Sequence, residues 1–180
     1  MTLIAVTKDY IYVDEMVTIS GRVVNYQPSA KILRIGREGI LLIAGIGSSL
    51  AAVATVKDML LKLNDPNLNN TEAYHIVNDI SRKLMSSENS FAASFWTYVT
   101  KTHVFSLTID KHAKVAMYLH DELIDGKSVV AGSGGETFRV YHTRGFSSDK
   151  AAQLAVMNTP TCGGTIRKLK IASFFQTALG

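Results

Sequence analysis

This sequence lacks several features that mark secreted or membrane-spanning proteins. It has a single cysteine, Cys162, so no disulfide can form within the chain, which suits a reducing compartment. No apolar run approaches the roughly 18 to 20 residues that a membrane-spanning helix needs, and the first residues lack the basic and apolar regions of a signal peptide. We therefore expect a soluble cytoplasmic protein with no membrane partner.

Clustered charges and metal-ligand spacings are also absent. The net charge is +4, but the Lys and Arg residues are scattered along the chain, which argues against a nucleic-acid partner. His103, His112 and His120 do not have the spacing of metal ligands and fit strand or turn positions better. We expect neither a bound metal nor a cofactor.

The residues that are present predict one domain over residues 1–180, because 180 residues of which 47% are hydrophobic can bury a full core. Apolar, β-branched and aromatic runs predict strands at residues 3–6, 10–13, 22–26, 30–35, 40–44, 95–100, 103–109, 113–119, 127–133 and 164–172. Helical spacing predicts helices at about residues 48–63, 71–85, 134–145 and 147–158, although residues 134–145 would also suit a strand.

The order of these elements predicts the fold class. Strands come first, followed by two helices, a second set of strands, two more helices and a last strand. Such an order favours an α+β protein in which two antiparallel sheets pack face to face between helical layers, a four-layer αββα sandwich.

Six segments resemble one known family. "TLIAV", "YVDE", "SAKILRIG", "AGIGSSLAA", "VVAGSGG" and "CGGTIRKLKI" follow one another along nearly the whole chain. Each is weak alone, but their order and spacing together resemble the proteasome β-subunit and HslV family of N-terminal nucleophile hydrolases, in particular the short proteasome-like proteases of bacteriophages. The resemblance implies the Ntn-hydrolase fold.

The resemblance also implies a threonine peptidase whose nucleophile is Thr2. In this family the first residue of the mature chain supplies both a hydroxyl nucleophile and, through its α-amine, the base that takes the hydroxyl proton. An α-amine has a pKa of about 7.7 to 8.0, which suits this role at neutral pH. Thr2 would gain a free amine on removal of Met1, so we expect no longer propeptide to be needed.

Four further residues match the family's site. By resemblance, Lys31 lowers the pKa of the amine through like-charge proximity, and Asp14 holds Lys31 in its charged form. The backbone N–H of Gly47 would form the oxyanion hole at a helix N-terminus, and Ser133 would hydrogen-bond the terminal amine.

One segment departs from the family pattern. The family usually has an aspartate three positions before a serine or threonine near the last strand, and this acid orients the serine and the amine. Here "TPTCGGT" places Thr159 at the acid and Cys162 at the hydroxyl residue. The loss of one member of a catalytic unit can lower the rate by several orders of magnitude.

The residues taken alone leave other interpretations open. Asp14 would be a turn carboxylate, Lys31 a surface amine, and Gly47 a helix-start glycine without a ligand. Two functions therefore remain: a peptidase acting on peptides or proteins, or an inactive member of the fold that serves as a structural or interaction protein, such as a phage protein that engages a host or self-assembled partner. The resemblance further implies a homo-oligomer, which is a ring in this family, and an ATP-driven unfoldase as a partner.

Overall fold

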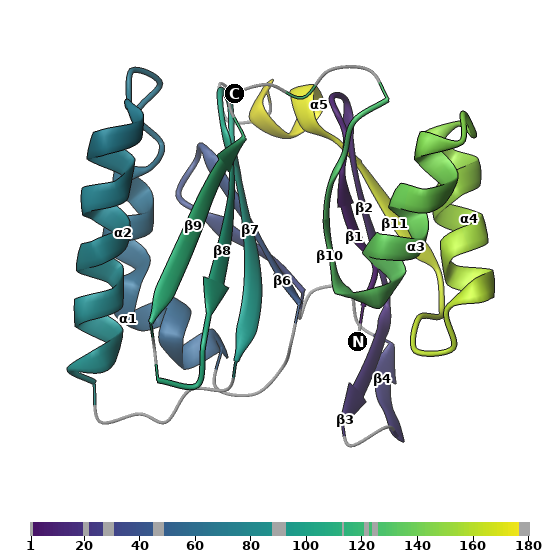
Figure 1. Cartoon of the computed structure of the whole chain (residues 1–180), viewed down its shortest axis with the longest axis horizontal. Helices are drawn as coiled ribbons and strands as arrows, with labels where there is room; N and C mark the ends of the chain where they lie inside the picture. The colour runs from purple at the N-terminus through teal and green to yellow at the C-terminus, as the bar shows by residue number, and fades with distance from the viewer. Residues whose placement is uncertain are drawn as a thin grey trace. The chain divides into compact units, whose positions relative to one another are not determined.

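The computed structural model describes residues 2–19, 22–26, 31–44, 49–87, 93–112, 114–120, 123 and 126–176 (Figure 1). The chain divides into two compact units, one formed by residues 1–32 with residues 122–180 and the other by residues 33–121. Each unit combines an antiparallel sheet with helices, as the predicted α+β class requires.

The first unit contains a four-stranded antiparallel sheet with the order β10-β1-β2-β11, and a separate two-stranded hairpin. Three helices belong to the same unit. The bounds of these elements are β1 Ile4–Val6, β2 Tyr10–Asp14, β3 Met16–Ile19, β4 Arg22–Tyr26, β10 Val129–Ala131, α3 Gly132–Thr143, α4 Ser148–Asn158, β11 Ile166–Lys170 and α5 Ile171–Gln176.

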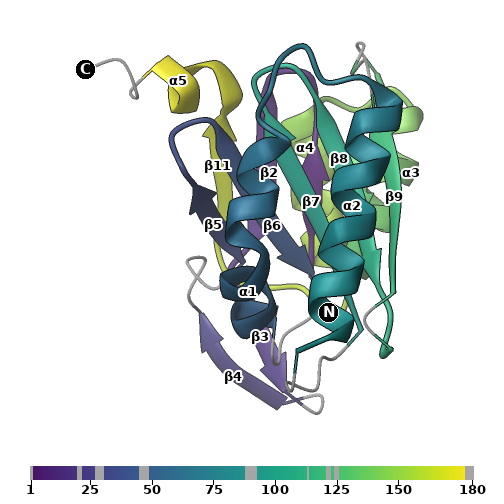
Figure 2. The ribbon, with the colours of Figure 1, turned by 90° about the vertical axis from the view of Figure 1, so that its left-hand side faces the viewer.

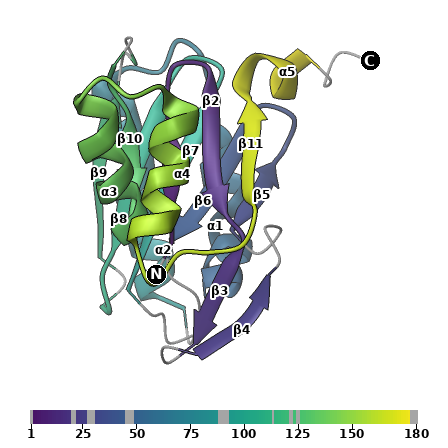
Figure 3. The same ribbon diagram turned by 90° about the vertical axis from the view of Figure 1, so that its right-hand side faces the viewer.

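A short turn joins β1 to β2, as the sequence predicts. The Thr7 N–H donates to the Tyr10 carbonyl at 2.8 Å, and the Thr7 hydroxyl accepts the Tyr10 N–H at 3.1 Å. On one face of the sheet, α3 and α4 lie side by side (Figure 3). Phe138 of α3 packs against Tyr12 with its ring centre 5.7 Å away, within a core to which α4 contributes small alanine side chains.

The second unit contains a five-stranded antiparallel sheet with the order β5-β6-β7-β8-β9, covered on one face by α1 and α2 (Figure 2). Every residue of β6 is buried, in agreement with the apolar run predicted there. The bounds are β5 Ile32–Ile35, β6 Gly39–Ala44, α1 Ser49–Lys62, α2 Asn70–Met85, β7 Ser94–Thr100, β8 Val104–Ile109 and β9 Val115–His120.

Two elements differ from the sequence-based expectation. Strand β3 was not expected, and α5 occupies residues 171–176, where the final strand was expected to continue to residue 172. Short apolar segments such as these do not reveal by periodicity alone whether they form strand or helix. The segment of ambiguous preference is helical up to Thr143, the last residue of α3, and the preceding strand is confined to β10.

Candidate active site

Thr2 lies two residues before the start of β1, against the start of α3. Its carbonyl oxygen accepts the N–H of Gly134 at 3.2 Å. A Cβ atom added to Gly132, whose φ is +76°, would lie 2.2 Å from the same oxygen, so this approach requires glycine. The Thr2 side chain is 2% exposed, which places its hydroxyl inside the first unit.

Asp14, the last residue of β2, accepts hydrogen bonds from several groups of the site. Its Oδ1 accepts the Thr2 hydroxyl at 2.7 Å, the Leu3 N–H at 2.8 Å and the Lys31 ammonium at 2.6 Å. Its Oδ2 accepts the Gly163 N–H at 3.2 Å. Because β1 and β2 pair antiparallel with Ile4 opposite Val13, the end of β2 returns to the start of β1 and brings Asp14 to Thr2.

Lys31 and Asp14 form a buried ion pair. Their side chains are 2% and 0% exposed, so neither is the surface group that the residues alone would suggest. Burial lowers the pKa of Lys31, and the hydrogen bond and charge of Asp14 oppose that change. Thr2 and Lys31 share one carboxylate oxygen as their acceptor, which brings the hydroxyl and the ammonium together.

Ser133 lies in the first turn of α3, between the two glycines that meet Thr2. Its hydroxyl oxygen is 3.0 Å from the hydroxyl oxygen of Thr161, a residue that the sequence did not single out. Its predicted bond to the terminal amine stays a prediction. Gly47, the predicted oxyanion-hole donor, lies outside the described residues.

The segment that departs from the family pattern contacts α3. The Thr159 hydroxyl donates to the Thr137 hydroxyl at 2.9 Å, and the Cys162 N–H donates to the Thr159 carbonyl at 2.9 Å. Cys162 is 7% exposed, and its burial, together with the charge of Asp14, raises the pKa of its thiol to about 11. The thiol is therefore uncharged at neutral pH, as a hydroxyl would be.

Thr161, Gly163 and Thr137 are the residues of this cluster that sequence reasoning missed. Thr161 and Gly163 both lie in the segment "TPTCGGT", which lacks the acid of the family pattern. Thr137 lies one helical turn after Ser133. The location of Thr161 and Gly163 in this segment could therefore have indicated a role at the site. Their residue types could not, because threonine and glycine are common in turns.

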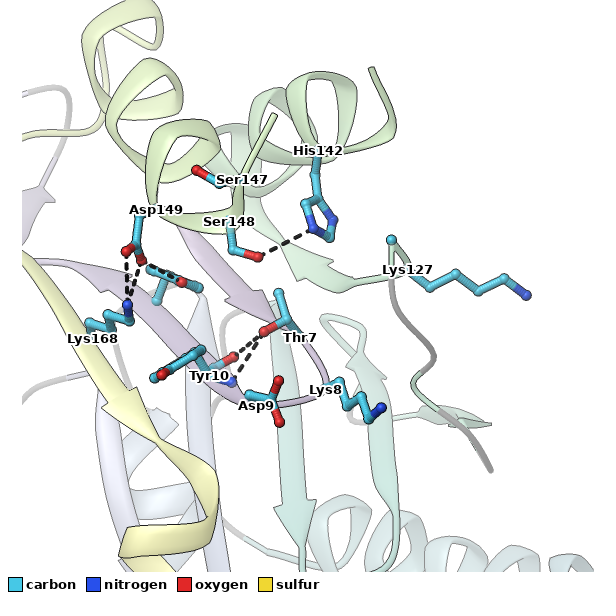
Figure 4. Close-up of a pocket in the computed structure, with 12 residues that line it drawn as sticks. Thr7, Lys8, Asp9, Tyr10, Lys127, His142, Ser147, Ser148, Asp149 and Lys168 are labelled. Carbon is cyan, nitrogen blue, oxygen red and sulfur yellow. Dashed lines mark hydrogen bonds and ion pairs between the residues drawn. The ribbon is translucent and has the colours of Figure 1, made fainter. Parts of the chain in front are cut away.

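A pocket of about 220 Å³, lined mainly by charged and hydroxyl-bearing residues, lies elsewhere in the first unit (Figure 4). It is bordered by the turn between β1 and β2, by Lys127, and by the start of α4, where Ser148 lies 3.3 Å from the Nε2 atom of His142. Lys168 binds Asp149 on one side of this pocket. Thr2, Asp14 and Lys31 do not line it, so the clustered site and the pocket are separate features.

The described part of the chain has neither a metal-binding cluster nor a membrane-spanning helix. In that part, no three His, Cys, Asp or Glu side chains gather so that they could hold a metal ion. None of the helices there has the length and apolar character needed to cross a membrane.

Comparisons with known proteins show similarity at the level of structure. Protein-family models and curated protein sequences give no match. Among solved structures, eukaryotic HslV from Trypanosoma brucei superimposes with a TM-score of 0.65 and 16% identity, over 94% of this chain and 98% of that one. BPH from Thiobacillus denitrificans gives a TM-score of 0.57 at 16% identity, over 94% of this chain and 96% of that one.

A second structure of the same Thiobacillus protein, in complex with epoxomicin, gives a TM-score of 0.59 at 18% identity, over 94% of this chain and 97% of that one. All three similarities extend over nearly the full length of both chains. The fold predicted from the sequence is thereby confirmed: this chain has the Ntn-hydrolase fold of HslV.

Proposed function

We propose that this chain is a threonine peptidase that hydrolyses peptide bonds through an acyl-enzyme on Thr2, after removal of Met1. The observation that carries the proposal is the convergence of the Thr2 hydroxyl, the Leu3 N–H and the Lys31 ammonium on one buried oxygen of Asp14. The similarity of the fold to HslV supports the same class of reaction.

The proposed reaction uses the hydroxyl and the α-amine of the same residue. Thr2 Oγ1 attacks the carbonyl carbon of the peptide bond, and the hydroxyl proton passes to the α-amine. The C–N bond then breaks, and the leaving amine takes that proton from the α-ammonium. Water attacks the resulting ester with the α-amine again as base, which releases the carboxylic acid and restores the hydroxyl.

Lys31 and Asp14 have supporting roles in this proposal. The Lys31 ammonium disfavours a second positive charge on the nearby α-amine, which keeps the amine available as a base near neutral pH. Asp14 binds Lys31, Thr2 and Leu3 through a single oxygen and so holds the two residues that precede β1 next to the lysine. Gly47 is proposed as the donor to the oxyanion.

A second candidate function is an inactive member of the fold that acts as a structural or interaction protein. It is favoured by Thr159, because the hydroxyl at this position bonds Thr137 and supplies no carboxylate to Ser133 or the amine. We place the peptidase first, because a carboxylate and a lysine that served no chemistry would still incur the desolvation penalty of burial.

The wider setting of the peptidase is also part of the proposal. We propose peptides or unfolded proteins as substrates, a ring of identical subunits in the cytoplasm, and an ATP-driven unfoldase that supplies substrate. A relationship to the short proteasome-like proteases of bacteriophages completes the proposal and rests on the sequence motifs alone.

Intact mass spectrometry with a β-lactone probe tests the peptidase. The Thr2 hydroxyl opens the lactone ring to form an ester while the ring oxygen becomes a hydroxyl, so the chain gains the whole mass of the probe. We expect the purified chain to lack Met1 and to be labelled once, at Thr2. Epoxomicin, which is bound in the Thiobacillus structure, serves as a second probe.

Two threonine variants are the matched controls for this experiment. Thr2→Ala should abolish labelling, whereas Thr7→Ala, which lies just after the opposite end of β1, should leave the labelled fraction unchanged. Retention of Met1, or a wild-type chain that resists both probes, would favour the inactive structural protein instead.

A further inference from the structure

Two pairs of hydroxyl groups join α3 to the turn that follows α4. Thr161 Oγ1 lies 3.0 Å from Ser133 Oγ, and Thr159 Oγ1 donates to Thr137 Oγ1 at 2.9 Å. Ser133 and Thr137 are four residues apart and so occupy the same face of the helix. The turn is therefore attached at two points to the part of α3 that meets Thr2.

The geometry of this turn sets the position of Thr161. The Cys162 N–H donates to the Thr159 carbonyl at 2.9 Å, which closes a four-residue turn with Pro160 in its second position. Proline favours that position because its φ is already close to the required value. Thr161 follows in the third position, so a rigid turn presents its hydroxyl to Ser133.

Ser133 is held beside the start of the chain's first strand. The residue before it, Gly132, approaches the Thr2 carbonyl too closely to accommodate a Cβ atom, and the residue after it, Gly134, donates its N–H to that carbonyl. The Ser133 hydroxyl thus lies in the turn of α3 that contacts the proposed nucleophile, with Thr161 as its hydrogen-bond partner.

We propose that Thr161 is a positioning residue that accepts the hydroxyl hydrogen of Ser133 and so orients Ser133 toward the α-amine of Thr2. The inference rests on the proposed peptidase function. A base must keep its lone pair free for the incoming proton, so Ser133 has to accept an N–H of the amine rather than donate to its nitrogen. Ser133 can do so when its own hydrogen is already bound by Thr161.

This arrangement offers a replacement for the acid that the family pattern would place at Thr159. A carboxylate would also accept the Ser133 hydrogen, but its negative charge would raise the pKa of the α-amine. The hydroxyl of Thr161 provides the acceptor without the charge. The amine is then a free base at a lower pH than it would be beside a carboxylate.

The rate of β-lactone labelling at Thr2 tests this inference in the full chain. Thr161→Val keeps the shape of the side chain but removes the acceptor, and we expect the maximal labelling rate to fall roughly tenfold or more, with little change in the probe concentration that gives half of that rate. Thr161→Ser keeps a hydroxyl and should restore most of the rate. Thr159→Val removes the neighbouring hydroxyl pair and should have a much smaller effect on the rate.

A double-mutant cycle separates orientation of Ser133 from general support of α3. If Thr161 acts through Ser133, the Ser133→Ala, Thr161→Val double variant should be no slower than Ser133→Ala alone. Additive losses in the cycle, or equal losses in Thr161→Val and Thr159→Val, would overturn the inference.

Labelling of the wild-type chain distinguishes failure of the positioning role from failure of the peptidase proposal. If the wild-type chain is labelled and Thr161→Val is labelled as fast, the positioning role fails and the peptidase stands. If the wild-type chain is not labelled, both proposals fail. Thermal unfolding of each variant identifies any that do not fold. If Thr161→Val does not fold, Thr161→Ser provides the comparison. An unchanged labelling rate and pH profile in Thr161→Ser support the hydroxyl as the required group, whereas a loss of rate like that of Ser133→Ala contradicts it.

Discussion

The Asp14 carboxylate is the residue on which the candidate site depends. It is fully buried and binds a hydroxyl, a backbone N–H and an ammonium through one oxygen. Removal of one partner from a buried ion pair leaves an uncompensated charge and typically lowers stability by about 3 to 5 kcal/mol. Lys31 and Asp14 are therefore linked to folding as well as to the proposed chemistry.

Cys162 gives the site a pH dependence that can be measured. Burial raises the pKa of its thiol from 9.0 to about 11, with Asp14 adding to the effect and Lys31 opposing it. The folded chain thus favours the protonated thiol, and this stabilisation is fully present below pH 9.0 and is lost as the pH rises to about 11. We expect it to contribute on the order of 2 kcal/mol.

Urea unfolding of the wild type and of Cys162→Ala across this pH range measures the effect. The free energy of unfolding should fall more steeply with rising pH in the wild type than in the variant. The difference in slope is the readout, because the cavity left by alanine changes the stability of the variant by the same amount at every pH. Parallel slopes would show that the thiol titrates alike in the folded and unfolded chains.

At the scale of elements, α3 begins with a glycine that lies too close to the Thr2 carbonyl for a side chain to fit. Gly132 has a φ of +76°, and a Cβ atom there would lie 2.2 Å from the Thr2 carbonyl oxygen. The same helix is followed by Gly145, which has a φ of +90° and nothing within 4 Å of an added Cβ atom. Both glycines have a positive φ, but only Gly132 is crowded by a neighbouring backbone atom.

We expect Gly132→Ala to be clearly more destabilising than Gly145→Ala. A left-handed conformation at a residue with a side chain costs about 1 to 2 kcal/mol, and both variants incur it. Gly132→Ala adds a clash with backbone that cannot move without displacing Thr2, so it should lose at least about 1 kcal/mol more and also slow β-lactone labelling. Denaturant unfolding of both variants checks this expectation, and equal losses would contradict it.

Most elements could be predicted from the sequence because they are long or strongly patterned. The buried run of β6 and the spacing of apolar residues in α2 are local signals. Strand β3 and helix α5 could not be predicted, because segments of four and six residues, only partly apolar, are too short to distinguish the two periods. Tertiary contacts that periodicity does not show accompany both elements: β3 pairs with β4 in a hairpin, and the Ile171 N–H at the start of α5 donates to the Asp9 carbonyl at 2.9 Å.

At the scale of the whole molecule, similarity to HslV extends over 94% of the chain at only 16% identity. Such a similarity reflects the order and packing of the elements more than individual residues. It supports the fold, whereas activity and assembly depend on particular side chains and surfaces that the comparisons do not test.

We expect the chain to assemble with itself in solution. The ring proposed by resemblance requires a native mass that is a multiple of 19.6 kDa, measured by light scattering or native mass spectrometry at micromolar concentration. A single species of 19.6 kDa under these conditions would rule out a stable ring. A concentration series would detect a weaker assembly.

The sequence by itself determined the fold class, because hydrophobic periodicity and the order of the elements are local properties of the chain. Its resemblance to a known family proposed Thr2, Asp14, Lys31 and Ser133 for the site. Only the tertiary structure showed that three donors share one buried oxygen of Asp14, and that Thr161 is the partner of Ser133. These contacts join residues 11 to 28 positions apart, and strand pairing and helix docking create them during folding.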